Sequence, residues 1–139
     1  MRRLIIIFLP ILLLASCQRD ITSEDLLKIN GYWEIEKVIL PNGENKDYTI
    51  NETNDYFEIK NNEGFRNKVI AQLNGKYLEN GLSEKIKVEF NESQILLHYA
   101  TPYAKWTEEV IEVSDEKLVL KNQENIEYHY KKPIPFSLK

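Results

Sequence analysis

The sequence predicts an all-β fold, an antiparallel up-and-down meander of eight to ten strands that follows a short N-terminal helix and closes into a barrel. From Gly31 onward, segments of four to nine residues rich in Ile, Val, Tyr, Phe and Trp are separated by clusters of Asn, Gly, Asp, Glu and Ser, a pattern typical of strands joined by tight turns. Apolar and polar residues alternate within several segments, so each strand has one face for a core and one for water. Such a meander hides its apolar face and its edges by closing as a barrel or by stacking as a two-sheet β-sandwich. We expect the barrel.

Residues that favour turns separate the expected strands. Pro41-Asn42-Gly43 and Asn74-Gly75 supply positions that accept a positive φ angle. Alternation is clearest in Lys85 to Phe90, where Ile86, Val88 and Phe90 share one face. The expected strands cover residues 32–40, 46–51, 55–60, 65–73, 76–79, 85–90, 94–100, 105–113, 117–122 and 126–131.

One segment before the first strand has a helical pattern. Thr22 or Ser23 can cap a first turn that carries Glu24 and Asp25, and Leu26, Leu27 and Ile29 form a small apolar stripe. We expect a short helix over residues 21–30 that covers one end of the sheet.

The first residues have the layout of a secretory signal. Met1-Arg2-Arg3 precedes the apolar run 4–15, which is 12 residues long and contains a proline, too short for a permanent membrane span of roughly 20 residues. The run ends in Leu14-Ala15-Ser16-Cys17, which resembles the lipobox of bacterial lipoproteins. This resemblance implies cleavage between Ser16 and Cys17, removal of the signal peptide 1–16, and acylation of Cys17. The lipid bilayer is then a partner, and two or more acyl chains make a stable anchor.

The remaining composition describes one exported domain. Cys17 is the only cysteine, so packing alone must hold the domain together. Without the signal there are 16 basic residues against 22 acidic ones, a formal charge of −6, which argues against nucleic acid as a partner. We therefore expect a lipidated tether over 17–22 and a β domain over 23–139. Gln18 follows the cysteine where enteric bacteria place an inner-membrane retention aspartate, which favours the outer membrane, on either its periplasmic face or the cell surface.

The start of the first strand suggests a family. Gly31-Tyr32-Trp33 follows the helical segment and resembles the Gly-x-Trp signature of the lipocalin superfamily. In that family a late arginine packs across the tryptophan, a part that Lys131 or Lys132 would take here. Together with the lipobox and the late strand Leu118 to Lys121, the pattern is similar to small lipocalin-like lipoproteins of the Bacteroidetes. The resemblance implies a lipocalin-like barrel over about residues 26–131, in which Gly31 and Trp33 have structural roles.

No motif for catalysis or metal binding stands out. His98 and His129 lack a second histidine or cysteine at metal-ligand spacing; Ser83, Ser93 and Ser114 suit turns, and none lies in a nucleophile elbow. We expect neither an enzyme nor a bound cofactor or metal. A hydrolase acting on lipid or glycan is a third hypothesis, for which the exported location is the only support.

An aromatic hairpin offers the candidate ligand site. Tyr99, Tyr103 and Trp106 are grouped in one expected hairpin, where they either cover the core or edge the mouth of an apolar cup that takes a small molecule. The first function hypothesis is a membrane-anchored envelope lipoprotein whose barrel binds or carries a small hydrophobic or amphipathic molecule. The alternative is a non-enzymatic interaction or scaffold module of an envelope complex, with an unknown protein partner.

Overall fold

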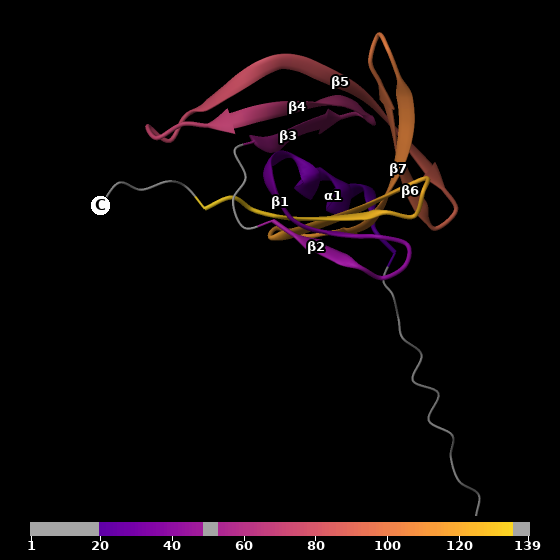
Figure 1. The fold of residues 1–139 in the computed structure, drawn as a ribbon. Helices are drawn as coiled ribbons and strands as arrows, with labels where there is room; N and C mark the ends of the chain where they lie inside the picture. Colours follow the sequence, from indigo (N-terminus) through magenta and orange to yellow (C-terminus); the bar gives the residue numbers. More distant parts are fainter. Residues whose placement is uncertain (1–19, 49–52, 135–139) are drawn as a thin grey trace, which may run out of the picture.

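Nine strands form one antiparallel sheet, eight of which close into a ring with a short helical segment at one end (Figure 1). The computed structural model describes residues 20–48 and 53–134. The helical segment consists of α1 (Ser23–Leu26) and the 3-10 turn η1 (Leu27–Ile29). The strands are β1 (Gly31–Ile39), β2 (Asn45–Asp47), β3 (Thr53–Lys60), β4 (Glu63–Ala71), β5 (Tyr77–Asn91), β6 (Gln94–Ala100), β7 (Lys105–Val113), β8 (Lys117–Asn122) and β9 (Glu127–Lys131).

The predicted barrel is confirmed, and the two-sheet sandwich is not formed. Each strand from β3 to β9 pairs antiparallel with the next. The ring closes because β1 pairs with β3 through residues 31–33 and with β9 through residues 34–39. Eight strands therefore make the barrel, and the short β2 pairs beside the second half of β1. Closure leaves few unpaired edges along the described strands.

The helical segment covers one end of the barrel, as expected, although it is shorter than the predicted span. Thr22 is the N-cap, and its side chain and that of Asp25 form a reciprocal capping box. Leu26 and Ile29 are 2% and 0% exposed. Asn30 fastens the segment to β3, since its amide side chain accepts from the backbone N–H of Ile59 at 2.7 Å and donates to the Ile59 carbonyl at 3.1 Å. No helix among the described residues has the length and apolar character to cross a membrane.

The β5 strand corrects one prediction. Residues 76–79 and 85–90 belong to a single strand rather than two. The intervening residues form an irregularity opposite Lys68, where the pairing shifts from Asn67↔Ser83 to Val69↔Glu79. Gly81 has a φ of 80°, so the chain absorbs the extra residues as a bulge and continues in the same direction.

The up-and-down order gives the barrel two distinct ends. The connections β3–β4, β5–β6 and β7–β8 lie at the end closed by α1 and η1, which we call the base. The connections β1–β2, β4–β5, β6–β7 and β8–β9 lie at the other end, which we call the mouth. The described chain starts at the base, because Asp20 lines a surface hollow with Ile111 and Val113 near the end of β7.

The apolar core fills the base half of the barrel and extends toward the mouth at Tyr99. Thirteen buried residues from the helical segment and the inward faces of the strands make one cluster, bounded in the sequence by Leu26 and Tyr130. A fragment that begins at Gln18 therefore retains the whole core. The cluster comprises Leu26, Ile29, Trp33, Phe57, Ile59, Ile86, Ile95, Leu97, Tyr99, Val110, Leu118, Leu120 and Tyr130.

Gly64 on β4 permits a close approach between β3 and β4 inside the base. A Cβ atom at this position would lie 1.8 Å from the Glu58 carbonyl oxygen and 2.8 Å from the Ile59 Cα. Both are backbone atoms and cannot move without disturbing the pairing. We expect Gly64→Ala to lower the free energy of unfolding by at least about 2 kcal/mol, as in overpacked cores, measured by urea denaturation. Gly43→Ala is the comparison variant, since nothing lies within 4 Å of its Cβ position. Its φ of 85° still costs an alanine about 1–2 kcal/mol, so a loss at Gly64 no larger than the loss at Gly43 would contradict the steric argument.

Candidate ligand cavity

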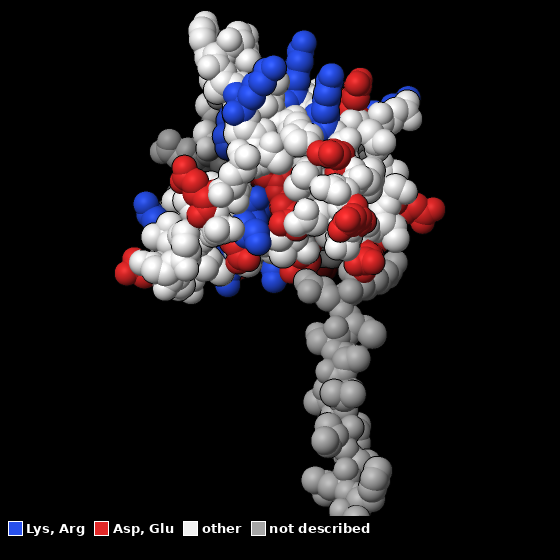
Figure 2. Space-filling view, turned by 90° about the vertical axis from the view of Figure 1, so that its right-hand side faces the viewer, with Lys and Arg blue, Asp and Glu red and all other residues white. Residues whose placement is uncertain are grey.

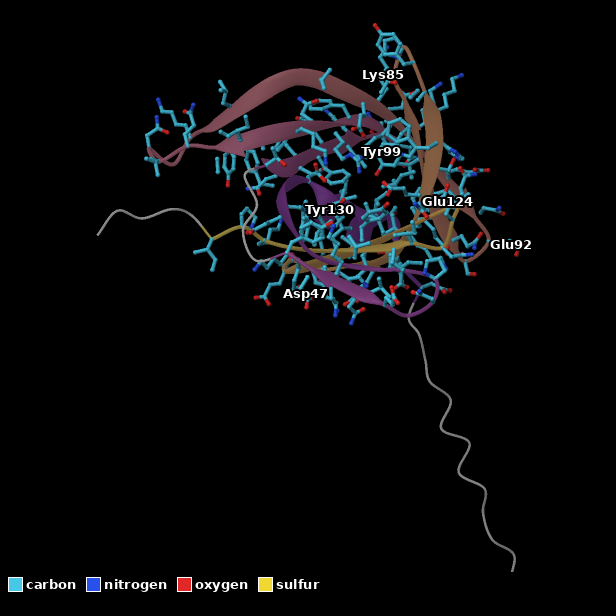
Figure 3. The ribbon with its side chains drawn as sticks, viewed as in Figure 1. Asp47, Lys85, Glu92, Tyr99, Glu124 and Tyr130 are labelled. Atoms are coloured by element: carbon cyan, nitrogen blue, oxygen red, sulfur yellow. The ribbon has the colours of Figure 1, made fainter. Side chains whose placement is uncertain are left out.

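A cavity of about 420 Å³ lies in the mouth half of the barrel. Its wall is aromatic and aliphatic, and charged side chains from β3, β4 and β7 complete it. Figure 3 shows Tyr99 and Tyr130 within the ring of strands, whereas Lys85 and Asp47 lie outside it. The lining residues are Trp33, Ile35, Tyr48, Thr53, Asp55, Arg66, Lys68, Trp106, Glu108, Asn122, Tyr128 and Tyr130.

Five charged residues, Asp55, Arg66, Lys68, Glu84 and Glu108, form a layer beside the cavity, which we call the charged layer. Arg66 lies at its centre. Its Nε atom donates to Glu84 Oε2 at 2.8 Å and its Nη1 atom to Glu108 Oε1 at 3.2 Å. Arg66 and Glu108 are 8% and 5% exposed, so both charges are largely removed from water. Ion pairs at such depth are maintained only where each partner keeps its hydrogen bonds.

A second ion pair completes the layer. Asp55, 4% exposed, pairs with Lys68, whose side chain is 42% exposed. Strand alternation explains why these residues meet, because Arg66 and Lys68 are two apart on β4 and Asp55 is directly opposite Lys68 on β3. The layer therefore contains three carboxylates and two cations.

Burial and neighbouring charges shift the pKa values of the side chains in and around the charged layer. Burial raises the pKa of Glu108, an effect that the Arg66 charge opposes. Burial alone would lower the pKa of Arg66, but Tyr99, Tyr130, Asp55 and Glu108 around it raise that pKa well above its usual value. The pKa values of Tyr99 and Tyr130 are also well above normal, first because both side chains are buried. Both hydroxyls therefore stay protonated beside a guanidinium that stays charged.

Stacked aromatic rings connect the charged layer to the cavity wall. Tyr99 and Trp106 are cross-strand partners on β6 and β7, and their rings stack at 5.3 Å with an interplanar angle of 6°. The Arg66 guanidinium lies 4.5 Å from the Tyr99 ring centroid, within cation–π range. The expected apolar cup is therefore mixed, with an apolar core at its base and aromatic and charged groups toward its mouth.

The structure brings together two of the three predicted ligand residues. Tyr99 is 1% exposed and Trp106 lines the cavity. Tyr103 lies outside it and is 97% exposed, because it occupies the β6–β7 turn in which Thr101 Oγ1 accepts from the backbone N–H groups of Tyr103 and Ala104. Sequence reasoning missed Asp55, Arg66, Lys68 and Glu108, although each is at an inward position of an alternating strand.

The Gly-x-Trp segment has its expected structural position at the base. Trp33 is fully buried and its Nε1 donates to the Ile29 carbonyl at 2.7 Å. Of the two candidate lysines it is Lys132 that lies over the indole, with Nζ 3.9 Å from the ring centroid. Lys131 does not take this position because side chains alternate along a strand. Tyr130 points inward, so Lys131 points outward and Lys132 points inward again. Gly31 has a φ of 119° and leaves room for Lys132.

The histidines form local pairs rather than a metal centre. His98 bonds Glu89 at 2.7 Å and Thr107 at 2.9 Å, and His129 bonds Glu127 at 3.1 Å. In the described ranges, no group of three or more His, Cys, Asp or Glu side chains could hold a metal ion. The predicted cleavage and lipidation residues, Ser16 and Cys17, lie outside the described residues.

The closed eight-stranded meander, with a helical turn at its base and a cavity at its mouth, defines a lipocalin-like protein. The family model for the lipocalin-like domain matches residues 29–120, and the chain belongs to this family. The chain is similar to a lipocalin-like protein from Bacteroides uniformis, at 11% identity and a TM-score of 0.48 over 76% of this chain and 99% of that one. A protein from Bacteroides eggerthii is 14% identical, with a TM-score of 0.46 over 75% and 98%. Apocrustacyanin C1 is 10% identical, with a TM-score of 0.47 over 84% and 67%. A search of curated protein sequences found no match.

Proposed function

We propose that this chain is an outer-membrane lipoprotein, anchored through acylated Cys17, whose barrel binds one small amphipathic molecule in the mouth cavity. The observation that carries this proposal is the cavity of about 420 Å³, which combines an aromatic wall with a buried charged layer. Ligand sites typically have volumes of about 300–1,000 Å³ and place a few polar groups in a largely apolar wall.

The two kinds of lining suit two parts of one ligand. Trp106, Tyr128 and the other rings offer flat apolar surface, which favours an apolar or aromatic portion. Arg66 and Glu108 lie at the same cavity with their charges already paired, so a neutral or zwitterionic polar group can hydrogen-bond there without leaving a charge unpaired.

The arrangement of the barrel ends supports a carrier role away from the anchoring membrane. Asp20, three residues after Cys17, lies at the base, whereas the cavity lies toward the mouth. A lipid on Cys17 would thus leave the mouth free to exchange its ligand with the aqueous side.

Ligand binding is tested on the fragment 18–139, purified from cells and extracted with organic solvent under denaturing conditions. Mass spectrometry should detect one amphipathic compound in the extract at near-stoichiometric amount. The emptied fragment should then bind the neutral dye N-phenyl-1-naphthylamine, and Trp106→Ala should weaken binding about ten-fold, the scale of one lost aromatic contact.

Tyr103→Ala is the matched control, because it removes an aromatic side chain of the same hairpin that lies outside the cavity. Its dye affinity should remain that of the unmodified fragment. An empty fragment that does not bind the dye, or equal losses in both variants, would overturn the proposal.

A further inference from the structure

Three lysines gather on the outer face of the barrel near its mouth. Lys85 and Lys105 are the cross-strand neighbours of Ala100 on its two sides, and Lys87 follows two residues after Lys85 on the same face of β5. All three are exposed. At the usual strand spacing, Lys85 and Lys105 are about 10 Å apart across the small Ala100 side chain. We call Lys85, Lys87 and Lys105 the lysine triad.

The triad surrounds a hollow of about 460 Å³, separate from the charged layer of the barrel interior. His98, Thr107 and Gln123 also line it, and Ala100 contributes a small apolar surface. The hollow thus offers ammonium groups and the Gln123 amide around a small apolar patch, a combination that suits an anionic ligand with a carbon framework.

The triad carries charge that the protein itself does not neutralise. Among the described residues, no carboxylate forms an ion pair with Lys85, Lys87 or Lys105, whereas Lys117 at the base and Lys121 further along β8 pair with Glu112 and Glu109. The chain as a whole has a formal charge of −4. Figure 2 shows Lys and Arg side chains gathered at the upper end of this face, with an acidic side chain beside them and further acidic ones spread below. Like charges held together repel one another, so an anion that bridges them is favoured.

An exposed aromatic ring beside the triad narrows the class of partner. Tyr103, 97% exposed, stands at the tip of the hairpin two residues before Lys105. The flat face of a phenol ring packs well against the C–H groups of a sugar ring, and Tyr also supplies a hydroxyl for its polar groups. An acidic sugar chain combines the carboxylate that the lysines favour with the ring that Tyr103 favours.

The triad also faces away from the base. Lys105 begins β7, and Ile111, which lies beside Asp20, is six residues further along the strand, about 20 Å at the usual rise per residue. A partner at the triad therefore approaches from the mouth end, opposite the start of the described chain.

We propose that the lysine triad and Tyr103 bind an anionic glycan that carries carboxylate groups. The site is on the outer face, so it functions whether or not the interior cavity holds a ligand. Binding is expected to weaken as salt rises, because exposed charges are screened over about 10 Å at 0.1 M salt.

The test uses the fragment 18–139 and two soluble oligosaccharides of equal length, a galacturonate hexamer and the neutral maltohexaose, measured by isothermal titration calorimetry. The hexagalacturonate should bind and the maltohexaose should not. The triple variant K85Q/K87Q/K105Q should lose about ten-fold or more in affinity, since each exposed charge contact contributes roughly a two- to five-fold factor. Tyr103→Ala should weaken hexagalacturonate binding but leave any binding of inorganic sulfate unchanged.

The matched control is K60Q/K76Q/K117Q, which removes the same charge from exposed lysines elsewhere on the barrel and should retain full affinity. Equal losses in the two triple variants would show a net-charge effect and overturn the site. Binding to vesicles containing phosphatidylglycerol, without binding to the hexagalacturonate, would assign the triad to a lipid surface and overturn the glycan proposal. Dye binding in the cavity should be unchanged in K85Q/K87Q, so failure of this site and failure of the cavity proposal are distinguishable.

Discussion

Replacement of Arg66 by methionine should lower the free energy of unfolding by about 3–5 kcal/mol, the cost of leaving buried charges uncompensated. Glu84 and Glu108 both accept hydrogen bonds from this guanidinium, and Glu108 is 5% exposed. Methionine fills most of the space of the aliphatic stem but provides no donor. Urea denaturation of the fragment 18–139, followed by circular dichroism, measures the loss.

The size of this loss should depend on pH. Burial already raises the pKa of Glu108 above the unfolded value of 4.5, and Arg66 is the main group that opposes the rise. Without Arg66 the folded-state pKa moves further up, so the folded protein binds more protons than the unfolded chain. Stability of the variant is then greatest below about pH 4.5 and falls as pH rises through the raised pKa. A deficit that is the same at pH 4 and pH 7 would contradict the charge explanation.

Removal of the two carboxylates should restore much of the stability. The triple variant R66M/E84Q/E108Q retains side-chain volume but has no buried charge among these three residues. It should recover more than half of the loss and show little dependence on pH. Replacing all members of a buried ion group by uncharged side chains often changes the free energy of unfolding little. A triple variant as unstable as R66M would assign the loss to packing of the arginine stem.

Much of the fold is predictable because its determinants are local. Tight turns such as Asn74-Gly75 and alternation such as Ile86-Val88-Phe90 depend on neighbouring residues, and they place most strands within a few residues of their bounds. The bulge at Gly81 is the exception, since the same residues could form a turn or a bulge. Pairing with β4 decides between them, and no local pattern reports that pairing.

The site is predictable only where its members share a hairpin. Tyr99 and Trp106 are seven residues apart, so their contact follows from the β6–β7 turn. Arg66 and Glu108 are 42 residues apart, and their contact requires the register of three successive strand pairs, β4–β5, β5–β6 and β6–β7, and the closure of the ring. Alternation could nevertheless have indicated that Arg66 and Lys68 point inward, and that Lys132 rather than Lys131 returns to the interior after Tyr130.

Trp33 provides the second large expected effect. Trp33→Ala should lower the free energy of unfolding by about 3–5 kcal/mol, because it empties a fully buried site. The ring joins three parts of the base: its Nε1 bonds the Ile29 carbonyl, Lys132 covers one face, and the strand that carries it pairs with both β3 and β9. Loss of the ring therefore weakens the helical cover and the closing strands together.

Phenylalanine at position 33 separates packing from hydrogen bonding. Trp33→Phe keeps an aromatic ring for Lys132 but leaves the buried Ile29 carbonyl without its side-chain donor, and should cost about 1–3 kcal/mol. Trp106→Phe is the matched control, since Trp106 is only partly buried and forms no hydrogen bond through its indole nitrogen among the described residues, and its loss should stay below about 1 kcal/mol. Equal losses for the two phenylalanine variants would mean that Trp33 acts through ring volume alone, and that the bond to Ile29 does not hold the helical cover on the barrel.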